Sequence, residues 1–138
     1  MKYPKSPREK TGGIVYFGRM VEKIRLMAAG ELHPDLHANL GKGFDERCAD
    51  FLGVKYDALR AKVLEGLDDE RALEWCFENG TRPTPDQIEV WNGFMTKRGW
   101  NDEVSEILAR RKKESGFEHR DDIRTMFEYI DADEGRPA

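Results

Sequence analysis

The sequence lacks most of the features that mark a membrane, secreted or fibrous protein. It contains only two cysteines, Cys48 and Cys76, among 138 residues, too few for a disulfide-stabilised scaffold. No apolar run reaches the length of a membrane span, so none is expected. No export-type apolar segment follows the basic N-terminus, and the sequence therefore predicts a cytoplasmic protein with reduced thiols.

Large apolar residues are also scarce. Leucine, isoleucine, valine and phenylalanine together make up 29 of the 138 residues. This share is close to the level of about 20% below which chains tend to stay disordered. Three tryptophans, five methionines and four tyrosines add enough apolar surface for one folded core. Composition thus indicates a single folded domain, but it identifies no activity.

Charge is plentiful and unevenly placed. Charged residues reach 36% and the net charge is −4. Residues 1–30 have a balance of +5, whereas the remaining 108 residues have a balance of −9. Because nucleic-acid binding depends on cations that neutralise phosphates, this balance does not favour a nucleic-acid partner. We expect the basic arm, residues 1–13, to lie against the acidic body of its own fold, the alternative being an acidic partner.

Apolar residues recur at helical spacing along nearly the whole chain, and no segment shows a convincing strand pattern. Sequence signals for capping and for glycine termination divide the chain into segments. Helices are expected from Ile14 to Gly30, Phe44 to Gly53, Tyr56 to Gly66, Asp68 to Asn79, Thr84 to Gly99, Asn101 to Gly116 and Ile123 to Ile130. We predict one all-α domain over residues 1–138, a compact bundle of six or seven short helices, with a frayed acidic tail at 131–138.

The segment 33–48 holds the densest set of chemically active side chains. His33 and His37 lie within five residues of each other, and Asp45 follows soon after. Imidazole and carboxylate groups are ligands for zinc and other divalent metals, so these three residues are candidate metal ligands. Pro34 interrupts a regular helix, however, and the two imidazoles need not share a face. The alternative is a polar surface loop.

Cys48 is a candidate nucleophile in the same segment. A thiolate needs a nearby base to lower the pKa of the thiol, and His37 and Asp45 are the candidate partners. Cys48 also lies on the apolar stripe of its helix, which favours a buried packing role instead. An enzyme that uses this segment is therefore one alternative for the function.

Two cations beside the glycines of the 40–44 loop are candidate ligand-binding residues. Lys42 and Arg47 flank the start of the helix at Phe44, where free N–H groups could hold an anion. The loop lacks the spacing of a phosphate-binding P-loop, and acidic residues already occupy the first helical turn. A tight loop without a ligand is the alternative.

Residues 44–65 fit a helix-turn-helix template. Gly53 stands where the chain would turn between the two helices, flanked by apolar residues. Lys55, Arg60 and Lys62 could contact DNA from the second helix, but Asp57 and Glu65 oppose them. Since any two helices joined at a glycine give this pattern, a nucleic-acid binder is the second alternative.

Three stretches together resemble a family of small helical bacterial proteins catalogued as a domain of unknown function. They are Ser6-Pro-Arg-Glu-Lys-Thr-Gly-Gly, the run from His37-Ala-Asn-Leu-Gly-Lys-Gly-Phe-Asp through Phe51-Leu-Gly, and Glu89-Val-Trp-Asn-Gly-Phe-Met-Thr-Lys-Arg-Gly-Trp. The similarity extends over nearly the whole chain, including Asp131-Ala-Asp-Glu-Gly. It implies a bacterial, cytoplasmic single domain and brings no activity or cofactor. Our leading hypothesis is a protein-interaction or small-ligand-binding module, with self-association open and no membrane partner.

Overall fold

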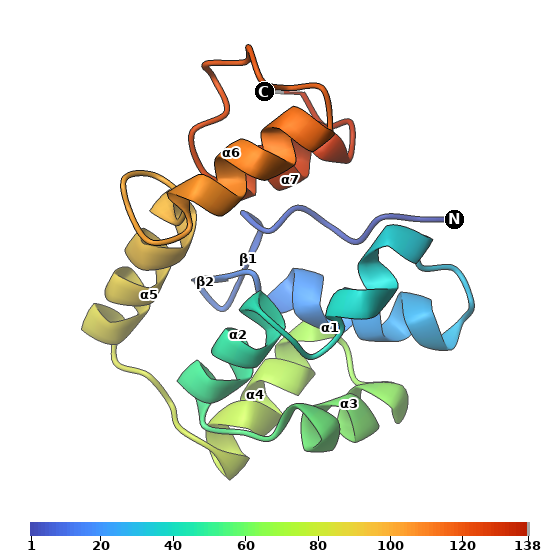
Figure 1. The fold of residues 1–138 in the computed structure, drawn as a ribbon. Helices are drawn as coiled ribbons and strands as arrows, with labels where there is room; N and C mark the ends of the chain where they lie inside the picture. The colour runs from blue at the N-terminus through green and yellow to red at the C-terminus, as the bar shows by residue number, and fades with distance from the viewer. Residues whose placement is uncertain (138) are drawn as a thin grey trace.

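Helices make up most of the protein, and the prediction of an all-α fold is confirmed (Figure 1). The computed structural model describes residues 1–137. None of the helices within them is both long enough and apolar enough to span a lipid bilayer. The elements are β1 (Lys10–Thr11), β2 (Ile14–Val15), α1 (Phe17–Ala28), the 3₁₀ helix η1 (Pro34–Asn39), α2 (Phe44–Leu52), α3 (Tyr56–Leu64), α4 (Asp69–Asn79), α5 (Pro85–Lys97), α6 (Ser105–Glu114) and α7 (Met126–Asp133).

Side-chain caps begin α4 and α5 where the sequence predicts them, whereas α6 begins at Ser105 and not at Asn101, and α7 begins at Met126 and not at Ile123. At the start of α5, the Thr84 side chain accepts the Gln87 backbone N–H, and the Gln87 side chain accepts the Thr84 backbone N–H. At the start of α4, the Asp68 carboxylate accepts the Arg71 N–H. These bonds satisfy N–H groups that have no partner within the helix, which is why a short sequence pattern locates the boundary.

A small β-hairpin precedes α1, and here the prediction that the chain contains no strand is wrong. Lys10 pairs with Val15 and Thr11 pairs with Ile14 in an antiparallel register. Gly12 and Gly13 between them have φ angles of 56° and 79°, the left-handed conformation that a two-residue type I′ turn requires at both positions. Side chains at either position would be strained there.

Contacts with α5 hold the hairpin in place. The Asn92 side chain accepts the Val15 N–H at 3.1 Å and donates to the Gly13 carbonyl at 2.8 Å. The Trp91 indole N–H donates to the Val15 carbonyl at 3.2 Å. The hairpin therefore depends on partners about 77 residues away in the sequence, which local patterns do not reveal. As a result α1 begins at Phe17 and not at Ile14.

The core surrounds α1. Phe17, Met20, Val21 and Ile24 are buried on this helix and belong to one large apolar cluster with residues of α2, α3, α4, α5 and α7. A second, smaller cluster lies beneath α6 and α7 at one end of the molecule (Figure 1). Burial of this kind is the main stabilising term for a domain of this size.

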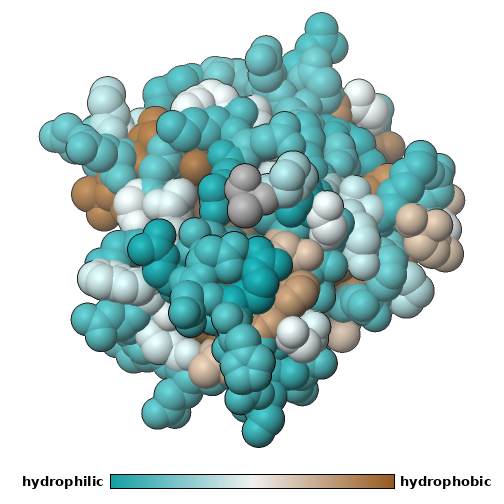
Figure 2. Space-filling model, turned by 90° about the horizontal axis from the view of Figure 1, so that it is seen from above, coloured by the Kyte–Doolittle hydropathy of each residue, from teal (hydrophilic) through white to brown (hydrophobic). Residues whose placement is uncertain are grey.

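The basic arm lies against the rest of the fold. The Lys5 ammonium is 2.7 Å from the Asp69 carboxylate, and the Arg8 guanidinium is 3.4 Å from that of Asp131. Hydrophilic residues cover much of the surface seen from the end of the molecule where α6 and α7 lie (Figure 1 and Figure 2). Cations of the arm thus form ion pairs with acids of the same chain, which is the arrangement expected of an arm that docks on its own acidic body.

The prediction of a frayed tail at 131–138 is wrong for the residues that the structure describes. Helix α7 continues to Asp133. The side chain of Glu134 is only 3% exposed and pairs with the buried Arg19 at 2.5 Å. Arg136 hydrogen-bonds Glu134 and the carbonyl of Pro4. An acidic composition alone could not indicate that α1 supplies a buried cation. Residue 138 lies outside the described residues.

Candidate functional site

The two histidines lie on a short helical segment near the surface. His33 caps η1, where its Nδ1 atom accepts the Asp35 N–H at 3.2 Å, and its ring stacks on Tyr3 with centroids 4.6 Å apart. The exposed His37 contacts the Leu32 carbonyl at 2.9 Å through Nε2. Each ring has a local structural partner within its own segment.

Asp45 is buried and is held by a different set of partners. Its carboxylate is 0% exposed and lies 2.9 Å from the Lys23 ammonium. It also accepts the Tyr16 hydroxyl at 2.6 Å and the Gly41 N–H at 3.0 Å. Among residues 1–137, no three histidine, cysteine, aspartate or glutamate side chains are arranged to hold a metal ion. His33, His37 and Asp45 are therefore not brought together as a ligand set.

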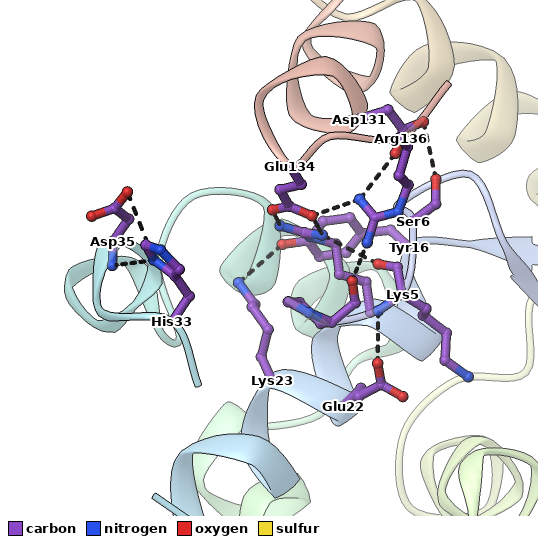
Figure 3. A network of polar contacts seen from close by, with 12 residues as sticks. Lys5, Ser6, Tyr16, Glu22, Lys23, His33, Asp35, Asp131, Glu134 and Arg136 are labelled. Atoms are coloured by element: carbon purple, nitrogen blue, oxygen red, sulfur yellow. Dashed lines mark hydrogen bonds and ion pairs between the residues drawn. The ribbon is translucent and has the colours of Figure 1, made fainter. Parts of the chain in front are cut away.

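Lys23 bonds Asp45 and the Tyr16 hydroxyl, and the charges of Arg19 and Glu134 lie near enough to act on it. Burial lowers the pKa of Lys23, although the nearby Asp45 carboxylate opposes the shift. Arg19 forms two hydrogen bonds with Glu134, at 2.9 and 2.5 Å, and a third with the Lys5 carbonyl. Figure 3 shows Asp131, Glu134 and Arg136, at the end of α7 and just after it, lying close to Ser6 of the arm. No buried side-chain nitrogen or oxygen of the described residues lacks a partner, and the paired charges join α1 to α2, to the arm and to the end of α7.

The cysteines are free and buried, as predicted. Burial raises the pKa of the Cys48 thiol well above its usual range, and the negative charge of Asp45 raises it further. Burial also raises the pKa of Cys76, to about 12. A thiol in such surroundings remains protonated and weakly nucleophilic. The geometry thus supports the packing role of Cys48 over the catalytic one.

The helix-turn-helix candidate folds as two helices joined at Gly53, which has a φ of 71°. On α3 only Leu59 and Val63 are buried, so its outer face is free of the core. That face carries charges of both signs, and Lys62 lies 3.4 Å from Glu65. Since neighbouring acids offset the cations that would contact phosphates, this face shows no basic surface suited to DNA.

A large open groove lies on the other side of α2. It has a volume of about 930 Å³, within the usual range for sites that hold small organic molecules. Helices α2 and α5 form its walls, and the segments around Thr81 and Val104 close its ends. The residues that line it are Gly43, Phe44, Glu46, Arg47, Asp50, Phe51, Thr81, Pro83, Asp86, Gln87, Val90, Trp91, Phe94, Arg98 and Val104. We call this the α2–α5 groove.

The amino-acid sequence builds one wall of this groove with a second apolar stripe on α5. Ile88, Trp91 and Met95 face the core, as expected for an amphipathic helix. Val90 and Phe94, four residues apart, face the groove, and Val90 is 71% exposed. This groove was not predicted from the sequence. The signal was present, because apolar residues on α5 cover more than one face.

Tight chain packing fixes the distance between the two walls. The Thr81 N–H donates to the Leu52 carbonyl at 2.8 Å, joining the end of α2 to the segment that leads into α5. Gly80 is required at this crossing because a Cβ atom there would collide with the Leu52 carbonyl oxygen. These backbone contacts thus fix the end of α2 against the segment that leads into α5.

Aromatic rings form the floor. Phe51 of α2 stacks on Trp91 of α5, with centroids 4.5 Å apart and planes within 10° of parallel. The Trp91 ring is anchored by its bond to the Val15 carbonyl. A stacked pair anchored in this way is a rigid apolar surface against which a flat molecule can pack.

Two arginines lie over the third aromatic ring. The guanidinium carbon of Arg47 is 4.9 Å from the Phe94 centroid, and that of Arg98 is 5.0 Å from it. Arg98 is also paired with Asp102 at 3.4 Å and with Glu103 at 2.9 Å. Within residues 1–137, no ion pair or hydrogen bond engages the Arg47 guanidinium, although it lies at the edge of an apolar surface. Its five N–H donors are available to a carboxylate, sulfonate or phosphate.

Of the two candidate ligand-binding residues, only Arg47 lies in the groove. Lys42 is exposed on the loop before α2 and is not among the lining residues. The rim also carries three exposed acids, Glu46, Asp50 and Asp86. An anion would therefore be accepted close to Arg47 and repelled elsewhere along the rim.

The chain belongs to a recognised sequence family. Residues 1–136 match the family described as a domain of unknown function, DUF5069, and the chain is a member of that family. The predicted resemblance over nearly the whole chain is thereby confirmed. No protein of curated function matches the chain.

Proposed function

We propose that this protein is a small-ligand-binding module, and that the α2–α5 groove holds an organic molecule with a flat apolar body and one anionic group. The observation that carries the proposal is the position of Arg47, a cation without an ionic partner beside the aromatic floor. Apolar ring surface and a few placed polar donors are the usual composition of ligand sites.

The aromatic rings and Arg47 contribute differently to binding in this site. The stacked Phe51 and Trp91 rings offer apolar area, which drives binding but distinguishes ligands poorly. Arg47 fixes the orientation of the ligand, because its planar guanidinium binds two oxygens of one anionic group. The three rim acids disfavour molecules with a second anionic group at the far end. The expected ligand is thus aromatic or alicyclic and carries a single negative charge.

A matched pair of fluorescent probes tests this assignment. The sulfonated dye 8-anilinonaphthalene-1-sulfonate and the neutral N-phenyl-1-naphthylamine share the same aromatic body and differ in the sulfonate. We expect both to bind, and Arg47→Gln to weaken the sulfonated dye about tenfold, since a charge-assisted contact contributes about 1.4 kcal/mol. The neutral dye should change less than about twofold, because it makes no such contact.

Controls separate the groove from general surface binding. Arg111→Gln removes an exposed arginine of α6 and should leave both dyes unaffected. Val90→Asp places a charge on the apolar rim and should weaken both dyes. Equal effects of Arg47→Gln on the two dyes would contradict the role given to Arg47, and no effect of Val90→Asp would place the dyes elsewhere.

A protein-interaction role is the second candidate, and the exposure of Val90 favours it. A valine that is 71% exposed on the rim of an apolar groove is a contact that a protein partner or a second copy of the chain could cover. Light scattering across a range of protein concentrations tests self-association. A dimer of the wild type that Val90→Asp dissociates would support this candidate, and a monomer at all concentrations would leave the small-ligand proposal.

We further infer a cytoplasmic location and a bacterial source. Two buried free thiols support the location, since reduced cysteines are typical of cytoplasmic proteins. The bacterial source is supported by the sequence resemblance described above. Detection of the tagged protein in the soluble cytoplasmic fraction of its host tests the location.

A further inference from the structure

Four cations converge on a second, smaller pocket, which lies apart from the α2–α5 groove. Arg8 and Lys10 reach it from the arm and β1, Lys97 from the end of α5, and Arg124 from the segment before α7. The pocket has a volume of about 380 Å³. We call it the cationic pocket. Like charges repel, so gathering four of them in a protein of net charge −4 requires a reason.

The acids around this pocket do not neutralise it. Glu128 is the only acidic side chain of the lining, and one of its oxygens accepts the Arg124 backbone N–H at 2.9 Å. Arg8 is paired with Asp131 at 3.4 Å and with Glu128 at 3.9 Å. Among the described residues, no carboxylate lies within ion-pair distance of Lys10, Lys97 or the Arg124 guanidinium. Three cations thus face a pocket that contains one acid.

An exposed indole ring lies in the same pocket. Trp100 is 52% exposed, and the Lys97 ammonium lies 5.4 Å from its ring centroid. Gly99 before it has a φ of 103°, and a Cβ there would lie 3.0 Å from the Met126 backbone nitrogen. This close crossing with the start of α7 holds Trp100 beside the cations. A large half-exposed aromatic side chain among cations is a combination used to stack rings that carry phosphate groups.

We propose that the cationic pocket binds a small organic phosphate whose aromatic ring stacks on Trp100, as a mononucleotide would. The phosphate oxygens lie among Lys10, Lys97 and Arg124, and the hydroxyls of Thr96 and Thr125 line the same pocket. The pocket volume is near the lower end for small-molecule sites, which suits one nucleotide unit and not a long chain. The acidic balance of residues 31–138 also repels an extended polyanion. This ligand is independent of the one proposed for the α2–α5 groove.

Calorimetry with three simple compounds tests the two halves of this ligand. Adenosine 5′-monophosphate supplies the ring and the phosphate, adenosine supplies the ring alone, and inorganic phosphate supplies the anion alone. We expect the monophosphate to bind at least tenfold more tightly than either part, and its affinity to fall as salt concentration rises. Equal affinities for the monophosphate and for inorganic phosphate would overturn the stacking role of Trp100. No binding of the monophosphate at millimolar concentration would overturn the proposal.

Matched variants place the binding in this pocket. The triple variant Lys10→Gln, Lys97→Gln, Arg124→Gln should weaken the monophosphate at least tenfold. The triple variant Lys55→Gln, Arg111→Gln, Lys113→Gln removes the same charge from exposed positions elsewhere and should change the affinity less than about twofold. Equal losses in both would overturn the assignment to this pocket. Trp100→Ala should weaken the monophosphate about fivefold or more and leave inorganic phosphate unchanged, because stacking involves only the ring.

Discussion

The buried charge network and the α2–α5 groove both place arginines beside acids and aromatic rings, yet they differ in how completely those groups are satisfied. In the network, Arg19 has two bonds to Glu134, and Asp45 has three partners. In the groove, the Arg47 guanidinium lies over the face of Phe94 and has no ion pair or hydrogen bond among the described residues. The same residue types therefore serve two purposes within one small domain.

This difference in pairing distinguishes charged residues that stabilise the fold from charged residues that are available to a ligand. A buried ion must be paired, since an unpaired one costs several kcal/mol, and evolution of the fold removes such orphans. An exposed cation at the edge of an apolar surface has no such requirement and remains available to a ligand. Incomplete pairing next to a cavity is thus a better sign of a binding site than burial or a perturbed pKa.

Asp45→Asn is expected to have the largest effect on stability. It removes the charge that compensates Lys23 at 2.9 Å while keeping the size of the side chain. Breaking a buried pair by removing one partner costs about 3–5 kcal/mol. Urea unfolding followed by circular dichroism measures the loss. Asp50→Asn on the same helix, at an exposed position, is the control and should change stability by less than about 0.5 kcal/mol. A loss below about 1 kcal/mol for Asp45→Asn would show that Lys23 is not held in the fold as a charge.

Glu134→Gln should have the next largest effect. The amide keeps one acceptor for Arg19 but loses the charge, and bonds to charged groups contribute about 1.5–3 kcal/mol. We expect the free energy of unfolding to fall by about 2–3 kcal/mol in the same measurement. Glu118→Gln, an exposed substitution nearby in the sequence, is the comparison. Equal stability of the two variants would mean that the tail does not hold α1, in conflict with the buried pair.

Asp69→Asn should have a smaller and pH-dependent effect, because it releases the arm from a half-buried site. Burial raises the pKa of Asp69, but the hydrogen bonds from Lys5 and Arg25 outweigh it, and the pKa is lowered overall. The stabilisation is therefore complete above the usual carboxyl pKa of about 3.9 and is lost as pH falls through the lowered value. We expect a difference of about 1–2 kcal/mol between wild type and variant at pH 7.

Unfolding curves at pH 7, 5 and 3 check this dependence. The difference between wild type and Asp69→Asn should remain constant from pH 7 to pH 5 and shrink at pH 3. Asp121→Asn, an exposed substitution, controls for general charge effects. A difference that grows as the solution is acidified would have the wrong sign for a lowered pKa and would rule out the Lys5 tether as its cause.

Sequence reasoning succeeded where structure is local and failed where it depends on distant partners. The capping box at Thr84 and the glycine at Gly53 act within four residues, so their sequence signals located α5 and the α2–α3 turn. The hairpin at 10–15 depends on Asn92, and Glu134 depends on Arg19, 115 residues away. No periodicity records such pairings, so the hairpin was missed and the tail was expected to fray.

The candidate site shows the same division. Arg47 was selected by its neighbourhood in the sequence, but the aromatic residues that give it a role come from α5, more than 40 residues later. His33 and His37 were selected because they are close in sequence, yet each bonds within its own segment. Closeness along the chain thus indicated which residue types lie in a segment, but not how their side chains are arranged in the fold.

Arg47→Gln should have almost no effect on stability, and this separates the two regions most sharply. Its guanidinium has no ion pair or hydrogen bond among the described residues and lies over the Phe94 ring, which Arg98 also covers at 5.0 Å, so the loss should stay within about 0.5 kcal/mol. Arg19→Gln provides the comparison, since that arginine is buried and fully paired, and it should lose about 2–3 kcal/mol in the same urea titration. Together with the dye measurements, the two substitutions should differ in their effects. Arg47→Gln should lower the affinity for the sulfonated dye and leave the free energy of unfolding unchanged, whereas Arg19→Gln should lower the free energy of unfolding. If Arg47→Gln instead destabilised the fold as much as Arg19→Gln, the guanidinium over Phe94 would be a structural element, and the groove would lose the one unpaired cation on which its assignment depends.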